Sequence, residues 1–282
     1  MNVPYHSARL EGKIARFLYR VALPMIVRQT IRVPRELPFD VFAYSGECTL
    51  PEQAASIRSF LTNAGRPKQF VVLSDGSYTT TSIELLEKID NCVRVQQTPP
   101  PLPPGLPNSI QSYLTTHPTG KQLALLINLP LNGPTLYADS DVLFFPQASE
   151  LADLSKRESI SALYLADYQF SGDERLILDP SEKQNPANTG FILLFRKLDW
   201  SLGLERLKML KGAPNFFTNQ TVMHLCMHAN GATALDPRKY VLQLDDQFVY
   251  RDRYASPSLA IRHYANPVRH KFWTAVAHRI FQ

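Results

Sequence analysis

Two acidic residues separated by one position interrupt an apolar segment in the middle of the chain. Asp139 and Asp141 lie within residues 136–145, whose other members are mostly apolar, aromatic or β-branched. In an extended strand, side chains two positions apart point to the same side, so we expect the two carboxylates to converge. Such a pair repels itself unless a cation or a shared proton lies between the oxygens. Because hard divalent ions prefer oxygen ligands, the pair predicts a metal site; a strand that simply ends in a polar turn is the alternative.

The segments that must position this pair alternate between strand-like and helix-like patterns. Short apolar runs predict strands at residues 39–44, 69–73, 93–96, 161–166 and 188–195. Longer mixed segments predict helices at residues 51–64, 79–89, 109–128 and 148–156. This order predicts an α/β fold with a mostly parallel sheet and helices on both faces.

Polar residues directly follow several of the predicted strands. In open α/β sheets, ligands bind beyond the carboxyl ends of the strands. The polar residues at these ends are Tyr44, Ser45, Asp75, Asp139, Asp141 and Asp167. We therefore expect them to gather along one edge of the sheet, where a ligand would bind.

Composition and charge narrow the class of protein. Of the 282 residues, 44% are hydrophobic and 20% charged, which is typical of a folded globular chain. The net charge of +5 comes from residues 1–35, which hold seven arginines or lysines and one glutamate. The basic balance therefore belongs to a terminal segment and does not indicate nucleic-acid binding. Three widely spaced cysteines (Cys48, Cys92 and Cys226) fit no metal-ligand spacing and indicate reduced thiols.

Residues 9–32 predict an amphipathic helix interrupted at Pro24. Basic residues occur at helical spacing on one face, and the apolar Leu10, Ile14, Phe17 and Val21 occur on the neighbouring face. The segment is too short and too charged to span a bilayer. It would either lie on an anionic membrane surface or pack its apolar face on the main domain and leave its arginines in water. Since no secretory signal is evident, we expect a cytoplasmic protein, with peripheral contact on the inner membrane face under the first alternative. The expected division is an arm at residues 1–36 and one domain at residues 37–282.

Three segments occur in one order and carry a family resemblance. They are the strand ending in DSD at 139–141, NTGFILLF at 188–195 and HYANPVRHKFW at 263–273. Together they resemble the GT-A-type nucleotide-sugar glycosyltransferases, closest to the glycogenin-like, family-eight group. The resemblance covers residues 39–273 in the order of elements. It departs from the family pattern at Asn266, where glycine is usual, and at Phe272, where proline is usual.

The resemblance implies a metal-dependent donor site. In this family the Asp-x-Asp pair and a later histidine, here Asp139, Asp141 and His263, hold a divalent ion bound to the diphosphate of a nucleotide sugar. The ion is usually manganese, and an imidazole beside carboxylates favours manganese over magnesium. Arg269 and Lys271 could clamp the same diphosphate. For His263 alone, the alternative is a core histidine hydrogen-bonded to the backbone.

Further residues border the donor if the resemblance holds. Asp167, Asn188 and Gln220 would border the sugar, with Asn219 in place of the family's usual aspartate. Asn188 could equally cap the start of its strand, and Gln220 could be an ordinary helix residue. The nucleotide would lie against Tyr44, Ser45, Asp75 and Ser140. The loop at residues 44–47 lacks the acidic residues common in the family, so the base stays open, although UDP is the usual one.

The resemblance therefore implies a metal-dependent hexosyltransferase that retains the anomeric configuration. Its acceptor would be a saccharide, a lipid or a protein. An inverting enzyme would instead need a general base, for which Asp245 or Asp246 would be tested. Two other functions remain open: a haloacid-dehalogenase-like phosphatase, in which the first aspartate is a nucleophile, and a non-catalytic protein of the same fold that docks on membranes or partners.

Overall fold

A mixed seven-stranded sheet forms the centre of the computed structural model, which describes residues 3–157, 159–244 and 258–280, without side chains for 278–280. The strand order is β3-β2-β1-β4-β7-β6-β8. The strands are β1 (Asp40–Ser45), β2 (Phe70–Ser74), β3 (Val93–Gln96), β4 (Thr135–Ala138), β6 (Ala162–Ala166), β7 (Ala187–Leu194) and β8 (Thr233–Ala234). All neighbours pair in parallel except that β7 runs antiparallel to both β4 and β6. The predicted α/β class and mostly parallel sheet are confirmed.

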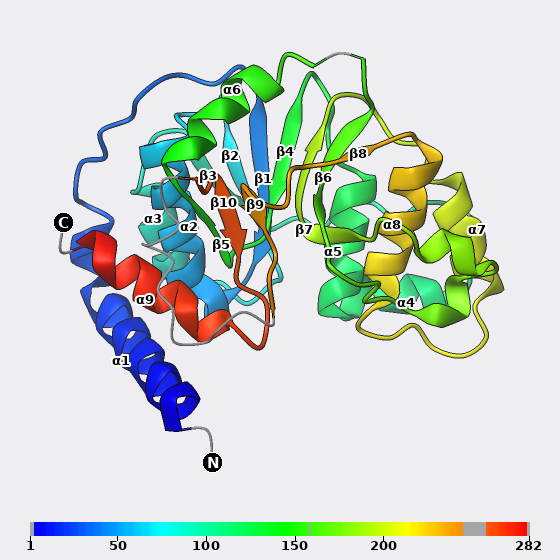
Figure 1. Cartoon of the computed structure of the whole chain (residues 1–282), viewed down its shortest axis with the longest axis horizontal. Helices are drawn as coiled ribbons and strands as arrows, with labels where there is room; N and C mark the ends of the chain where they lie inside the picture. Colours follow the sequence, from blue (N-terminus) through cyan, green and yellow to red (C-terminus); the bar gives the residue numbers. More distant parts are fainter. Residues whose placement is uncertain (1–2, 158, 245–257, 281–282) are drawn as a thin grey trace.

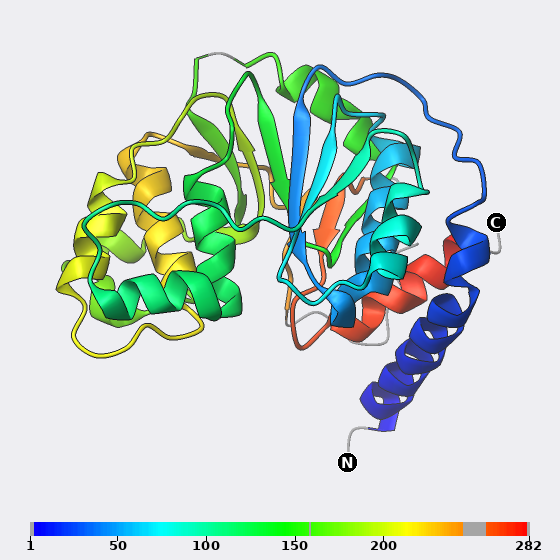
Figure 2. The same cartoon turned by 180° about the vertical axis from the view of Figure 1, so that it is seen from behind.

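Helices cover both faces of this sheet (Figures 1 and 2). On one face lie α2 (Leu50–Asn63), α3 (Thr80–Glu87) and the short α6 (Leu151–Leu154). Beyond them, at the edge of the molecule, α1 (Val3–Ile26) packs against α9 (Arg269–Ile280) and α2 (Figure 1). The other face packs against α4 (Asn108–Thr116), α5 (Pro118–Ile127), α7 (Ser201–Met209) and α8 (Thr218–Ala229). The strand pattern explains this, because Val41 and Ala43 enter the first core while Phe42 between them enters the second.

A second, three-stranded sheet begins directly after the acidic pair. It consists of β5 (Val142–Phe144), β10 (Ile261–His263) and β9 (Tyr240–Val241), with β10 between the other two. The segment at 136–145 is therefore two strands in two sheets. Asp139 and Asp141 lie in the tight turn between them, where Val142 N–H donates to Asp139 O at 3.1 Å. The expectation of an extended strand through the pair is wrong, and the turn brings the two side chains together instead.

Several helix boundaries also differ from the prediction. The helix expected at 109–128 is two helices, because His117 is extended (φ −81°, ψ 134°) ahead of Pro118. The helix expected at 148–156 has only the four residues of α6 after a 3-10 turn. Pro24 does not interrupt α1 but lies inside its last turn, so the helix ends at Ile26.

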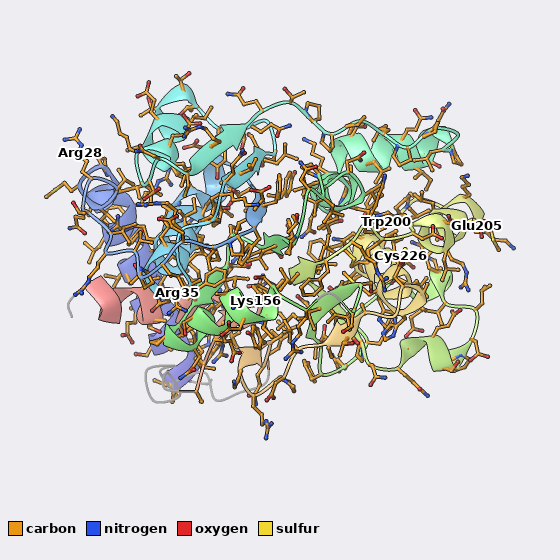
Figure 3. All side chains as sticks on the ribbon, turned by 90° about the horizontal axis from the view of Figure 1, so that it is seen from above. Arg28, Arg35, Lys156, Trp200, Glu205 and Cys226 are labelled. Atoms are coloured by element: carbon orange, nitrogen blue, oxygen red, sulfur yellow. The ribbon has the colours of Figure 1, made fainter. Side chains whose placement is uncertain are left out.

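The three cysteines are free thiols that differ in burial, and none forms a disulfide. Cys226 is buried beside Trp200, where α7 meets α8 (Figure 3), and burial raises the pKa of its thiol to about 12. Cys92 is half-buried, and Cys48 is exposed. Free thiols agree with the expectation from their spacing.

Candidate metal and donor site

Asp139, Asp141 and His263 come together at one point between the two sheets. One ligand atom from each of the three lies within 4.8 Å of the others. His263 Nε2 is 3.1 Å from Asp141 Oδ1 and 3.6 Å from Asp139 Oδ2. The pairing of β10 with β5 produces this geometry, because it sets His263 opposite Val142, the residue next to Asp141.

Asp139 is held in place from the α5 face of the sheet. Tyr137 Oη donates to Asp139 Oδ1 at 2.6 Å, and Gln122 Nε2 donates to the same oxygen at 2.8 Å. Burial raises the pKa of Asp139 to about 6. The neighbouring Asp141 carboxylate also raises this pKa, whereas His263 lowers it. The second oxygen of Asp139 faces the cluster and lies 3.6 Å from His263 Nε2, so a cation there would stabilise the charged carboxylate against the effect of burial.

Asp141 lies closer to positive charge than Asp139 does, because it contacts both His263 and Arg269. Burial alone would raise its pKa, but His263 and Arg269 outweigh burial and hold the pKa below its usual value. Arg269, the first residue of α9, donates to Asp141 Oδ2 at 2.8 Å. Asp141 is therefore a carboxylate in this structure, and one of its oxygens faces His263.

The ring of His263 is fixed by β7. Its Nδ1 lies 2.9 Å from Asn188 Oδ1, which also accepts the backbone N–H of Gly190 at 2.8 Å. Because this oxygen can only accept, Nδ1 carries the proton and Nε2 points to the carboxylates. Burial lowers the pKa of His263, but Asp141 and Asp139 outweigh it and raise the pKa above its ordinary value.

A second polar group lies at the start of α8. Gln220 Nε2 donates to Asp167 Oδ2 at 3.2 Å, and burial raises the pKa of that carboxyl. Asn219 Nδ2 donates to Gln122 Oε1 at 2.7 Å, so α8 is tied through Gln122 to Asp139. The residues expected to border a sugar thus connect to the residues expected to hold the metal.

Both groups line one cavity of about 710 Å³. Nine of the twelve predicted site residues are among its lining: Tyr44, Asp139, Ser140, Asp141, Asp167, Asn188, Gln220, His263 and Arg269. Tyr44 Oη and Arg269 Nε, both in this lining, are buried and have no hydrogen-bond partner among the described residues. Polar atoms in that state favour a polar ligand in the cavity.

Three predicted site residues lie outside this lining. Ser45 is buried, and its hydroxyl contacts Gln53 and Tyr78. The Asp75 carboxylate accepts hydrogen bonds from its own turn, and Lys271 is 2% exposed in the core. Asp245 and Asp246, the residues considered for an inverting mechanism, lie outside the described residues.

Sequence reasoning missed Gln122 and Tyr137, which orient Asp139. Tyr137 carried a signal, since it is two positions before Asp139 in β4 and faces the same side. Gln122 carried none, because it lies in the middle of α5 and reaches the acid only through tertiary packing. Phe216 and Phe217, both exposed, line the same cavity and were also not singled out.

The donor set fits a divalent cation. Two carboxylates and an imidazole supply three ligands, and the bond from Nδ1 to Asn188 is the outer contact that orients a metal-binding histidine. Oxygen and imidazole ligands together suit a first-row divalent ion. Among the described residues this is the one group of three or more such side chains close enough to share an ion.

Comparison with known proteins supports the fold. No family model and no curated protein matches the sequence. The galactosyltransferase LgtC, solved with donor and acceptor sugar analogues, is 14% identical over 85% of this chain and 95% of its own, with a TM-score of 0.56. The bifunctional glycosyltransferase WbbM is 13% identical over 89% of this chain and 51% of its own, with a TM-score of 0.57, so the chain spans about half of that protein. Mouse xyloside xylosyltransferase 1 is 12% identical over 83% of this chain and 98% of its own, with a TM-score of 0.52. The chain therefore has the GT-A-type fold that the resemblance implied.

Proposed function

We propose that this chain is a metal-dependent glycosyltransferase that moves a sugar from a nucleoside-diphosphate sugar to an acceptor. The observation that carries the proposal is the cluster of Asp139, Asp141 and His263 at the wall of a cavity in a GT-A-type fold. UDP is the expected nucleotide, and retention of the anomeric configuration is the expected outcome. The acceptor is a saccharide, a lipid or a protein, and the cytoplasmic location expected from sequence stays a prediction.

Each group has a role that follows from its surroundings. A divalent ion held by the three ligands, manganese in preference to magnesium, would stabilise the negative charge that grows on the leaving diphosphate. Tyr137 and Gln122 keep Asp139 turned towards the cluster. Arg269 adds a fixed positive charge beside Asp141, where phosphate oxygens would approach.

The donor sugar would lie towards α8. Asp167 and Gln220 already hydrogen-bond to each other and line the cavity, so both can exchange that bond for sugar hydroxyls. The side-chain oxygen of Asn188 already accepts hydrogen bonds from His263 and Gly190, which supports a role in positioning the His263 ring. Any contact of Asn188 with the sugar would then be made by its NH2 group. Tyr44 and Ser140 remain candidates for the nucleotide, since both line the cavity.

The test is nucleoside-diphosphate release from a panel of nucleotide sugars, with and without manganese. We expect release with a UDP-sugar that stops on chelation and falls at least about a hundredfold in Asp141→Asn. Asp153→Asn is the matched control, because this carboxylate has 78% of its side chain exposed and forms a salt bridge with Lys156 at the surface. Release by Asp141→Asn at the wild-type rate would refute the proposal.

The same preparation separates the two alternatives. A phosphatase would liberate phosphate from a simple phosphomonoester, and its activity would need no nucleotide. The fold likeness to glycosyltransferases does not support that alternative. A non-catalytic protein would release nothing from any donor, with or without metal.

A further inference from the structure

Helix α1 exposes a stripe of large apolar side chains. Twelve such side chains are exposed in the described part of the chain, and seven of them belong to this one helix. The seven are Val3, Leu10, Ile14, Phe17, Leu18, Val21 and Met25, each more than half exposed. At 100° per residue these positions fall on one side of the helix. Isolated exposed apolar residues need no explanation, but a contiguous stripe of this size indicates a surface that is covered in use.

The stripe is not the face by which α1 packs on the domain. That face consists of Gly12, Tyr19, Leu23 and Ile26, all buried. Tyr19 packs on Trp273 of α9 with ring centroids 5.2 Å apart, and the two helices run side by side at the edge of the molecule (Figures 1 and 2). The contact is close, because a Cβ at Gly12 would lie 2.6 Å from the backbone oxygen of His270. Packing therefore holds the opposite, apolar side outwards.

One flank of the stripe is basic. Arg9, Lys13 and Arg20 are exposed there and form no salt bridge with any described residue. Arg16, deeper on the same flank, is instead paired with Glu52 at 2.6 Å. The only acidic residue in the helix is Glu11. A second copy of α1 would thus offer almost no negative charge to match this flank, whereas an anionic surface matches its whole length.

We propose that α1 docks this protein on an anionic lipid membrane. The helix lies in the plane of the interface, with the apolar stripe among the upper acyl chains and Arg9, Lys13 and Arg20 at the headgroups. This arrangement combines apolar burial with attraction of basic side chains to anionic lipid. None of the helices in the described ranges is long and apolar enough to cross a bilayer, so the contact is with the surface.

Docking also orients the candidate site. Arg9 and Lys13 line a cavity of about 500 Å³ together with Asn266 and Arg269. The last two residues also line the larger cavity that contains the metal ligands. A docked α1 therefore places the smaller cavity, which shares Asn266 and Arg269 with the candidate site, close to the headgroups. The docking itself does not depend on the proposed transferase activity.

The test is flotation of the full chain with vesicles of phosphatidylcholine alone or mixed with phosphatidylglycerol, without donor or metal. We expect binding to the mixed vesicles that weakens with added salt. Phe17→Ser combined with Val21→Ser should weaken binding roughly tenfold or more. Lys13→Glu combined with Arg20→Glu should weaken it by roughly fivefold for each lysine or arginine lost, or more. All four side chains are exposed, so the variants should unfold at the wild-type temperature.

Matched controls come from the opposite end of the molecule. Leu178→Ser removes an equally exposed apolar residue, and Lys211→Glu reverses an exposed charge, so neither should alter flotation. Flotation of the α1 variants at wild-type levels, or none by the wild type, would overturn the proposal. So would a wild-type dimer that Phe17→Ser dissociates, since the stripe would then cover a second copy. Because no turnover is measured, these results are independent of the test of the proposed function.

Discussion

Replacing Gly190 by alanine would test how closely the candidate metal site is packed. A Cβ at this position would lie 2.3 Å from Cε1 and 2.4 Å from Nδ1 of His263, where ordinary contacts begin at 3.4 Å. The ring must therefore retreat by about 1 Å. It cannot do so without lengthening its contacts to Asn188 and Asp141, now 2.9 and 3.1 Å. A 1 Å displacement of a functional group costs roughly a hundredfold in activity, and overpacking lowers the free energy of unfolding by about 1–3 kcal/mol.

The assay separates these two effects. Manganese affinity is measured from the loss of the spin-resonance signal of the free aqueous ion, and stability is measured by urea unfolding. Gly203→Ala is the matched control, because its Cβ would lie 2.7 Å from Cys226 Sγ and Val222 Cγ1 in the α7–α8 contact. We expect both variants to lose stability and only Gly190→Ala to lose manganese affinity. Unchanged affinity in Gly190→Ala would refute the claim that the His263 ring is a positioned ligand.

Two further perturbations have outcomes that follow from single contacts. Asn188→Ala removes the acceptor that fixes the metal-facing tautomer of His263, so manganese affinity should fall by about 10–100-fold. Asn188→Asp keeps an acceptor and should retain most of the manganese affinity. Calorimetric titration of both variants with manganese measures the difference. His224 accepts the N–H of Ala187 at the start of β7, and burial lowers its pKa. As the pH falls, the imidazole of His224 is protonated first in the unfolded chain, so the free energy of unfolding should fall below about pH 6.5 and on through the lowered folded-state pKa. Urea unfolding between pH 5 and 8 should show a smaller fall in His224→Gln. An identical fall would contradict the assignment of this pH dependence to His224.

The acidic pair could be predicted from the sequence because its signal is local. Acids are seldom buried without partners, so the pair at Asp139 and Asp141 stood out in an apolar segment. His263 could be added only through the resemblance, because the pairing of β10 with β5 brings it across more than a hundred residues. The convergence of the acids was predicted correctly for the wrong reason, since a turn and not an extended strand produces it.

What could not be predicted depends on tertiary packing. The direction of β7 is not encoded in its apolar run, because a buried strand has the same composition whether it pairs in parallel or antiparallel. Gln122 is an ordinary polar helix residue until α5 packs beside β4. For α1, periodicity identified two faces but not which one would be buried, and the small Gly12 and the ring of Tyr19 proved to decide that.

Thermal unfolding with manganese and a panel of nucleoside diphosphates tests whether a metal ion and a nucleotide bind together at Asp139, Asp141 and His263. Only a ligand that prefers the folded state raises the melting temperature. We expect a shift that requires manganese and one nucleotide together, with UDP the first to be tested, and that disappears in Asp139→Ala. No shift with any nucleotide, or an equal shift in Asp139→Ala, would contradict a metal-dependent donor site at these residues.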